Sequence, residues 1–170
     1  PDYIKQAAID AINQNYHKYS PVDGFLDLKK AICKKFKRDN NLDYDTNQIV
    51  VSTGAKQSIA NVCMSLINKG DEVVIPTPYW VSYSAMVSLA DGIPVFVHPS
   101  EDGNYKVTAE QLESAITEKT KMIMLNSPNN PSGSVFSEEE YLEFSKVLLK
   151  YPNIIVVSDE IYEHINYGSK

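Results

Sequence analysis

Short runs of apolar residues alternate along most of the chain with segments whose apolar residues recur every three or four positions. The runs that predict strands are residues 49–51, 72–75, 94–97, 122–125 and 154–157. Helical spacing predicts a helix over 59–67, ended by Gly70, and another over 78–90 that begins at Thr77 and Pro78. Because apolar strands alternate with helices, we expect an α/β fold: a mostly parallel sheet with helices on both faces.

Two further helices are predicted before this alternation begins. Their apolar faces are Ile4, Ala8, Ala11 and Ile12 in the first, and Phe25, Leu28, Ile32 and Phe36 in the second. A turn over 19–24, which contains Pro and Gly, separates them. We therefore divide the chain into an amino-terminal helical segment, 1–48, and a larger domain, 49–170. Within that domain, Ser137 and Glu140 have the spacing of a capping box, which predicts a helix start.

Composition and charge argue against nucleic-acid and membrane partners. The 170 residues contain 16 Lys and Arg against 22 Asp and Glu, which gives a formal net charge of −6. Six of the basic residues fall between 29 and 38 at helical spacing, which predicts a solvated helix face. No apolar run approaches the ~20 residues of a transmembrane helix, and no signal peptide is visible. Cys33 and Cys63 form no disulfide or metal motif, so we expect a cytoplasmic protein without a metal.

The candidate chemistry follows the carboxyl ends of predicted strands, where open α/β sheets bind ligands. Residues 52–57 form a small-residue turn into a helix, which suits a phosphate, although a plain turn is the commoner explanation. The loop 126–133 holds two Pro and three Asn, which indicates a rigid loop able to present an amide. Asp159 follows an apolar strand, so its carboxylate needs a partner: a helix N-terminus, a Lys or a protonated ring nitrogen.

Two aromatic residues complete this candidate site. Trp80, the only Trp, is suited either to core packing or to stacking on a planar ligand. Tyr162 lies three residues after Asp159 and is expected in the same cleft. Three other tyrosines are assigned no function: Tyr83, Tyr141 and Tyr151. Together these residues predict a pocket for an anionic, aromatic and protonatable ring.

The motifs resemble those of the fold-type-I pyridoxal-phosphate (PLP) enzymes, specifically the class I aminotransferases of the aspartate aminotransferase type. The segments that match, in the same order, are 19–24, 52–57, 78–80, 126–133 and 158–162. The resemblance implies PLP as cofactor, an amino acid and a 2-oxo acid as substrates, and a homodimer. It also implies that this chain is part of the large cofactor-binding domain.

The resemblance assigns roles around the cofactor ring. Trp80 matches the aromatic residue that stacks on the pyridine ring, and Asp159 matches the carboxylate paired with the ring nitrogen. Asn130 and Tyr162 match the two groups that bond the phenolic oxygen. Trp80 and Asn130 are also implied to contact the substrate.

The resemblance assigns the cofactor phosphate to the backbone N–H groups of Ala55 and Lys56. Tyr19 matches a tyrosine that reaches the phosphate of the neighbouring subunit. The family's Schiff-base lysine and its carboxylate-binding arginine lie later than the match to Tyr162, and Arg38, the only arginine, is too early. No catalytic residue is therefore assigned within this chain.

Two alternatives remain open. The first is a PLP-dependent lyase or an enzyme like aminocyclopropane carboxylate synthase, because these enzymes share the same cofactor site. The second, from another class of protein, is a non-catalytic dimerising α/β module.

We predict that the 170-residue chain by itself has no aminotransferase activity, because the covalent anchor and the substrate clamp have no match in it. The measurement is 2-oxo-acid-dependent amino transfer by the purified chain supplied with PLP. A rate above that of free PLP would contradict the prediction.

Overall fold

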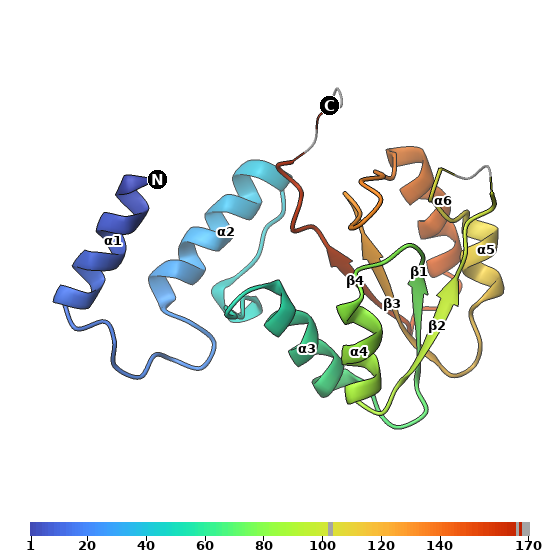
Figure 1. Ribbon diagram of the computed structural model, residues 1–170, viewed down its shortest axis with the longest axis horizontal. Coiled ribbons are helices and arrows are strands. Elements are labelled where there is room, and N and C mark those ends of the chain that lie inside the picture. The colour runs from blue at the N-terminus through green and yellow to red at the C-terminus, as the bar shows by residue number, and fades with distance from the viewer. Residues whose placement is uncertain (102–103, 166, 168–170) are drawn as a thin grey trace. The chain divides into compact units, whose positions relative to one another are not determined.

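The computed structural model describes residues 1–101, 104–165 and 167, and the chain forms two compact units, Pro1–Ser52 and Thr53–Lys170 (Figure 1). The first unit contains helices α1 (Asp2–Asn13) and α2 (Leu26–Asn40) and the short 3₁₀-helix η1 (Thr46–Gln48). Both predicted helices are therefore confirmed.

The turn that precedes α2 is hydrogen-bonded to a residue near the carboxyl end of the first unit. Val51 donates its backbone N–H to the carbonyl oxygen of Asp23 at 3.1 Å. Gly24 has a φ of +100°, and a Cβ at this position would lie 2.6 Å from a methyl carbon of Val51, so only glycine fits. The predicted strand over 49–51 is wrong, because these residues pair with no strand and Val51 bonds the turn instead.

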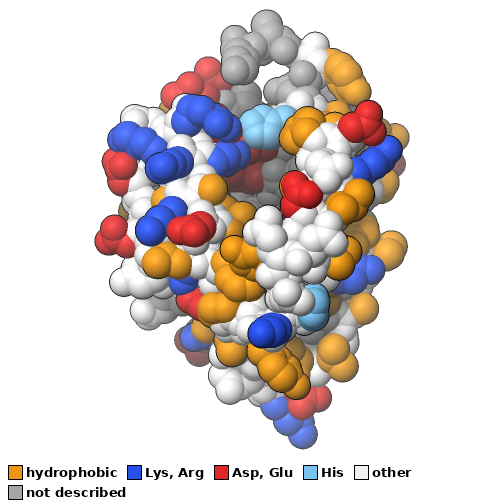
Figure 2. Space-filling view, turned by 90° about the vertical axis from the view of Figure 1, so that its left-hand side faces the viewer, with side chains coloured by type: hydrophobic (Ala, Val, Ile, Leu, Met, Phe, Trp, Pro, Cys, Tyr) orange, Lys and Arg blue, Asp and Glu red, His pale blue; other side chains and the backbone are white. Residues whose placement is uncertain are grey.

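The basic residues of α2 form a solvated face interrupted by acidic partners. Lys37 pairs with Asp43 at 2.7 Å, and Arg38 pairs with Asp39 at 2.5 Å. Figure 2 shows acidic side chains lying among the Lys and Arg side chains. Lys29 is the exception to the predicted solvated face, because it is buried against the carboxylate of Asp23.

The second unit is built on a four-stranded parallel sheet in the order β2-β1-β3-β4. The strands are β1 (Glu72–Pro76), β2 (Ile93–Val97), β3 (Thr120–Asn126) and β4 (Ile155–Asp159). All four correspond to predicted apolar runs. The central strands β1 and β3 are almost wholly buried, as their unbroken apolar sequences require.

Helices cover both faces of this sheet (Figure 1). On one face, α3 (Ala55–Leu66) and α4 (Ser82–Leu89) pack on β1 and β3 through a core that includes Cys63, Val87 and Met122. On the other face, α5 (Ala109–Ser114) and α6 (Glu138–Leu148) pack through Leu112, Ile123 and Phe144. The predicted α/β class is confirmed.

Of the two predicted helix-start signals, one is correct and the other is misplaced. The capping box of Ser137 and Glu140 opens α6 as predicted, with the Glu140 N–H donating to the Ser137 hydroxyl at 3.3 Å. The helix predicted from Pro78 begins only at Ser82. The reason is that Thr77 and Pro78 extend past the sheet edge, where the Thr77 N–H donates to the carbonyl oxygen of Val97 at 2.8 Å. Among the described residues no helix is long and apolar enough to cross a membrane.

We predict that Phe144→Ala lowers the free energy of unfolding by about 3–5 kcal/mol, because it opens a cavity in the core beneath α6. Leu142→Ala is the matched control on the same helix, where the side chain is 53% exposed, and should cost less than about 0.5 kcal/mol. Urea unfolding measures both. Equal losses would contradict the assignment of the core.

Candidate functional site

A cavity of about 170 Å³ opens where the carboxyl ends of β3 and β4 meet the amino terminus of α3. Its lining residues are Ala55, Trp80, Tyr83, Asn126, Asn130, Asp159, Ile161 and Tyr162. Five of the seven residues expected to bind the cofactor are therefore brought together in one place, at the sheet edge where the sequence analysis expected a ligand.

A larger cavity of about 700 Å³ shares Asn130 and Tyr162 with the first. Its other lining residues come from the loop after β3 and from the segment after β4, and none of them has a charged side chain. The described residues contain no group of three or more His, Cys, Asp and Glu side chains able to hold a metal ion. Of these two cavities, the smaller is therefore the one lined by a charged side chain, the carboxylate of Asp159.

Asp159 ends β4 and accepts hydrogen bonds at both carboxylate oxygens. The Tyr83 hydroxyl donates to Oδ2 at 2.5 Å, and the backbone N–H of Ile161 donates to Oδ1 at 3.2 Å. Burial, and after it the hydrogen bond to Asp159, raises the pKa of Tyr83 far above its ordinary value. The phenol is therefore held in its protonated, donating form.

Tyr83 is a residue that the sequence analysis missed. It is 2% exposed and lies on α4, and it was assigned no function. Its position three residues after Trp80 places both rings on one side of the segment, and the two rings meet edge to face with centroids 5.6 Å apart. That spacing is the one signal in the sequence that relates Tyr83 to the site.

Asn126 joins the two strand ends that form the site. Its amide Nδ2 donates to the backbone oxygen of Asp159 at 2.9 Å. Its Oδ1 accepts the backbone N–H of Asn130 at 2.8 Å. The Asn130 Nδ2 in turn donates to the Tyr162 hydroxyl oxygen at 3.3 Å. Asn130 and Tyr162 thus meet, as the resemblance implies, and Asn126 holds the loop that makes this possible.

Asn129 ties the same loop to the segment that leads to Trp80. Its Nδ2 donates to the carbonyl oxygen of Pro78 at 3.1 Å. Its Oδ1 accepts from the Ser132 hydroxyl at 2.8 Å. The loop is therefore held by side-chain hydrogen bonds, and its adjacent residues Asn129 and Asn130 bond different segments.

The amino terminus of α3 supplies the positive end of a helix dipole. Gly54 precedes the helix, and Ala55, its first residue, lines the cavity. N–H groups in the first turn of a helix have no partner within the helix, so those of Ala55 and Lys56 suit an anion. The Lys56 ammonium lies 5.0 Å from the centroid of the Trp80 ring. Tyr19, the remaining predicted residue, lies in the first unit with its side chain exposed.

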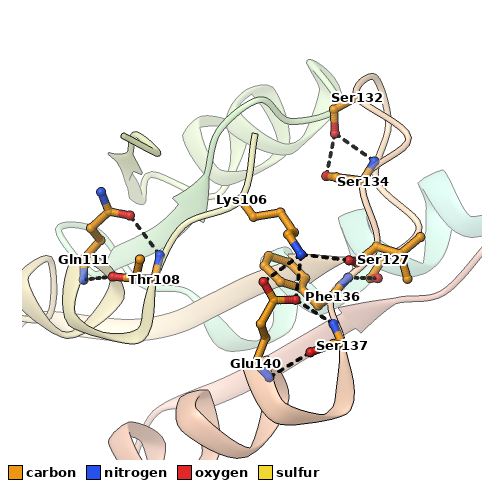
Figure 3. A network of polar contacts seen from close by, with 10 residues as sticks. Lys106, Thr108, Gln111, Ser127, Ser132, Ser134, Phe136, Ser137 and Glu140 are labelled. Carbon is orange, nitrogen blue, oxygen red and sulfur yellow. Dashed lines mark hydrogen bonds and ion pairs between the residues drawn. The ribbon is translucent and has the colours of Figure 1, made fainter. Parts of the chain in front are cut away.

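Hydrogen bonds and an ion pair hold the carboxyl-terminal end of the loop after β3 (Figure 3). Lys106 pairs with Glu140 at 2.7 Å and also donates to the carbonyl oxygen of Val135 at 3.3 Å. The Phe136 N–H donates to the Ser127 hydroxyl at 3.1 Å. Burial acts to raise the pKa of Glu140, but the hydrogen bond from Lys106 and others together hold it below its ordinary value.

Comparison with known proteins gives a single family. The sequence matches the family described as aminotransferase class I and II over residues 1–170. A probable aspartate/prephenate aminotransferase of Rickettsia felis is 53% identical over 167 residues, which are 98% of this chain and 41% of that protein. The aspartate aminotransferase of Bacillus subtilis is 47% identical over 170 residues, or 100% of this chain and 43% of that protein.

The fold comparison agrees. The crystal structure of aspartate aminotransferase from Rhizobium meliloti superposes with a TM-score of 0.97 at 46% identity, covering 100% of this chain and 42% of that one. The chain therefore spans about two fifths of the length of the relatives it matches.

We predict that Glu140→Gln lowers the free energy of unfolding by about 1 kcal/mol at neutral pH. Gln keeps the capping box, so the loss isolates the pair with Lys106. Because the folded pKa of Glu140 is lowered, this stabilisation is present above the unfolded pKa and disappears as the pH falls through the folded value.

Urea unfolding at several pH values measures this effect, with Glu143→Gln, on the exposed side of α6, as the control. The wild-type protein and Glu140→Gln should become equally stable in acid. A difference that persists unchanged to low pH would contradict the ion-pair account.

Proposed function

The chain belongs to the aminotransferase class I and II family, and on that premise we propose that the complete protein is a PLP-dependent aminotransferase. It transfers an amino group between an L-amino acid and a 2-oxo acid. The observation that best supports this proposal is the single cavity shared by the carboxylate of Asp159, the amide of Asn130, the ring of Trp80 and the amino terminus of α3.

The chemistry of this donor set fits PLP. A helix amino terminus suits the phosphate, and the carboxylate of Asp159 suits a protonated ring nitrogen. The Asn130 amide and the Tyr162 hydroxyl lie 3.3 Å apart and suit one phenolic oxygen between them. Trp80 offers a flat apolar surface to the ring. The phosphate, the ring nitrogen and the phenolic oxygen of the cofactor thus each have a partner of matching charge or hydrogen-bonding type.

The bound cofactor supplies a ring that accepts electrons from a carbanion at the alpha carbon of the substrate. The residues of this chain set the conditions for that chemistry. Asp159 keeps a proton at the ring nitrogen, because an anion beside the nitrogen favours its charged form. Asn130 and Tyr162 donate to the phenolic oxygen, and Trp80 covers the ring and excludes water from it.

The phosphate end is proposed to bind the N–H groups of Ala55 and Lys56. Tyr19 is proposed to reach the phosphate of the neighbouring subunit, which requires a homodimer. The large exposed side chain of Tyr19 is available for such a contact. The proposed compartment is the cytoplasm.

For the amino donor we propose L-aspartate. The support comes from the relatives, since those of Rickettsia felis and Bacillus subtilis are named as aspartate/prephenate and aspartate aminotransferases. An assay of the complete protein with L-aspartate and a 2-oxo acid tests this choice. Release of ammonia without any 2-oxo acid would instead indicate a lyase, and no turnover with PLP bound would indicate a non-catalytic module.

We predict that Asp159→Asn in the complete protein leaves the cofactor phosphate bound but lowers kcat by at least about 100-fold. A neutral amide cannot stabilise a protonated ring nitrogen as a carboxylate does. PLP absorbance measures binding, and steady-state kinetics measure kcat. Glu160→Gln, next in sequence but exposed, is the control. Normal turnover by Asp159→Asn would rule out the assigned role.

A further inference from the structure

We propose that Tyr83 is a positioning residue for Asp159: its hydroxyl fixes the orientation and the negative charge of that carboxylate, so that the proton shared with the cofactor stays on the ring nitrogen. This inference rests on the proposed function and adds to it a residue that the resemblance did not assign. The evidence is the geometry around the carboxylate, the burial of the tyrosine and the protonation of its hydroxyl.

The geometry leaves Tyr83 little freedom. Its ring belongs to the buried core between α4 and the sheet, where it packs with residues such as Val73 and Met86. Trp80 lies edge to face against it. Tyr83 also lines the polar cavity, where its hydroxyl meets Oδ2 of Asp159 at 2.5 Å. Packing in the core therefore orients the Tyr83 hydroxyl toward one carboxylate oxygen of Asp159.

The second carboxylate oxygen is also held. The Ile161 N–H donates to Oδ1 at 3.2 Å, so each oxygen of Asp159 has one protein donor. A cofactor ring nitrogen adds a further donor to a carboxylate that is already oriented. Because the Ile161 donor is backbone, the Tyr83 hydroxyl is the only one of the two that a side-chain substitution removes.

The protonation state of Tyr83 supports its role as a hydrogen-bond donor to Asp159. The titratable side chains that line the cavity are Tyr83, Asp159 and Tyr162, and the ammonium of Lys56 lies over Trp80. Burial, followed by the bond to Asp159, raises the pKa of Tyr83, which keeps its proton on oxygen at any working pH. The hydroxyl is thus a permanent donor to the carboxylate.

A carboxylate that accepts two protein hydrogen bonds is a weaker base than one that accepts a single bond. With the Tyr83 hydroxyl in place, the proton between Asp159 and the ring nitrogen therefore rests on the ring. Without the hydroxyl, the carboxylate gains basicity and rotational freedom, and the proton moves toward it. The positive charge of the ring, which makes it an electron acceptor, is then reduced.

The test uses Tyr83→Phe in the complete protein loaded with PLP that is ¹⁵N-labelled in the ring. The ¹⁵N chemical shift reports directly whether the ring nitrogen is protonated, from about pH 5.5 to pH 9. The matched control is Tyr79→Phe, which removes a neighbouring hydroxyl that bonds Ser84 at 3.1 Å rather than Asp159. Steady-state kinetics on the same proteins give kcat and KM.

The wild-type protein and Tyr79→Phe should keep the signal of a protonated ring across this range. Tyr83→Phe should be displaced toward the signal of a neutral ring over the whole range, because the proton moves to Asp159 within the pair rather than to solvent, with kcat lower by about tenfold and KM within about twofold. A Tyr83→Phe signal equal to the wild type at every pH would overturn the inference while leaving the proposed function intact. A wild-type protein that binds no PLP would overturn both.

Tyr83→His covers the case in which the Phe variant fails to fold. Its protonated imidazole donates to Asp159 and brings a positive charge beside the carboxylate, whereas the neutral ring brings no charge, and this titration falls inside the measured range. The ring-nitrogen signal should therefore acquire a pH dependence that follows the histidine. A signal that is independent of pH and equal to the wild type would overturn the positioning role.

Discussion

The pairing of β3 with β4 is the constraint on which the candidate site depends. The parallel register sets Asn126 directly beside Asp159, at the last residue of each strand. From that position the Asn126 side chain bonds both the Asp159 backbone and the Asn130 backbone. A shift of register by one residue would turn these side chains to the other face of the sheet and separate the polar groups. The site therefore follows from the apolar strands that fix the register.

The core between α4 and the sheet includes side chains that also form part of the candidate site. Trp80 and Tyr83 pack with the buried residues of β1 and β3, yet both also line the cavity. One short segment thus supplies a ring surface and a hydroxyl whose positions are set by packing rather than by a mobile loop. The carboxylate of Asp159 is half-buried and is stabilised by hydrogen-bond donors, and the core provides one of them.

Local patterns in the sequence were sufficient to predict the helices and strands that are determined by residues close together along the chain. Apolar runs identified β1 to β4, and the capping box at Ser137 identified the start of α6. The errors arose where distant residues decide the structure. Residues 49–51 have strand composition, but Val51 bonds the turn at Asp23. Tyr83 has an unremarkable helical context, and only its contact with Asp159, 76 positions away, relates it to the site.

The central claim is that Asp159, with Tyr83 behind it, pairs with the ring nitrogen of a cofactor whose phosphate sits at the start of α3. A crystal structure of the complete protein with PLP tests this most directly. The account predicts a carboxylate oxygen of Asp159 within hydrogen-bonding distance of the ring nitrogen, the Tyr83 hydroxyl still bonded to that carboxylate, and the phosphate at the N–H groups of Ala55 and Lys56. A cofactor bound elsewhere, or with its ring nitrogen facing away from Asp159, would contradict it.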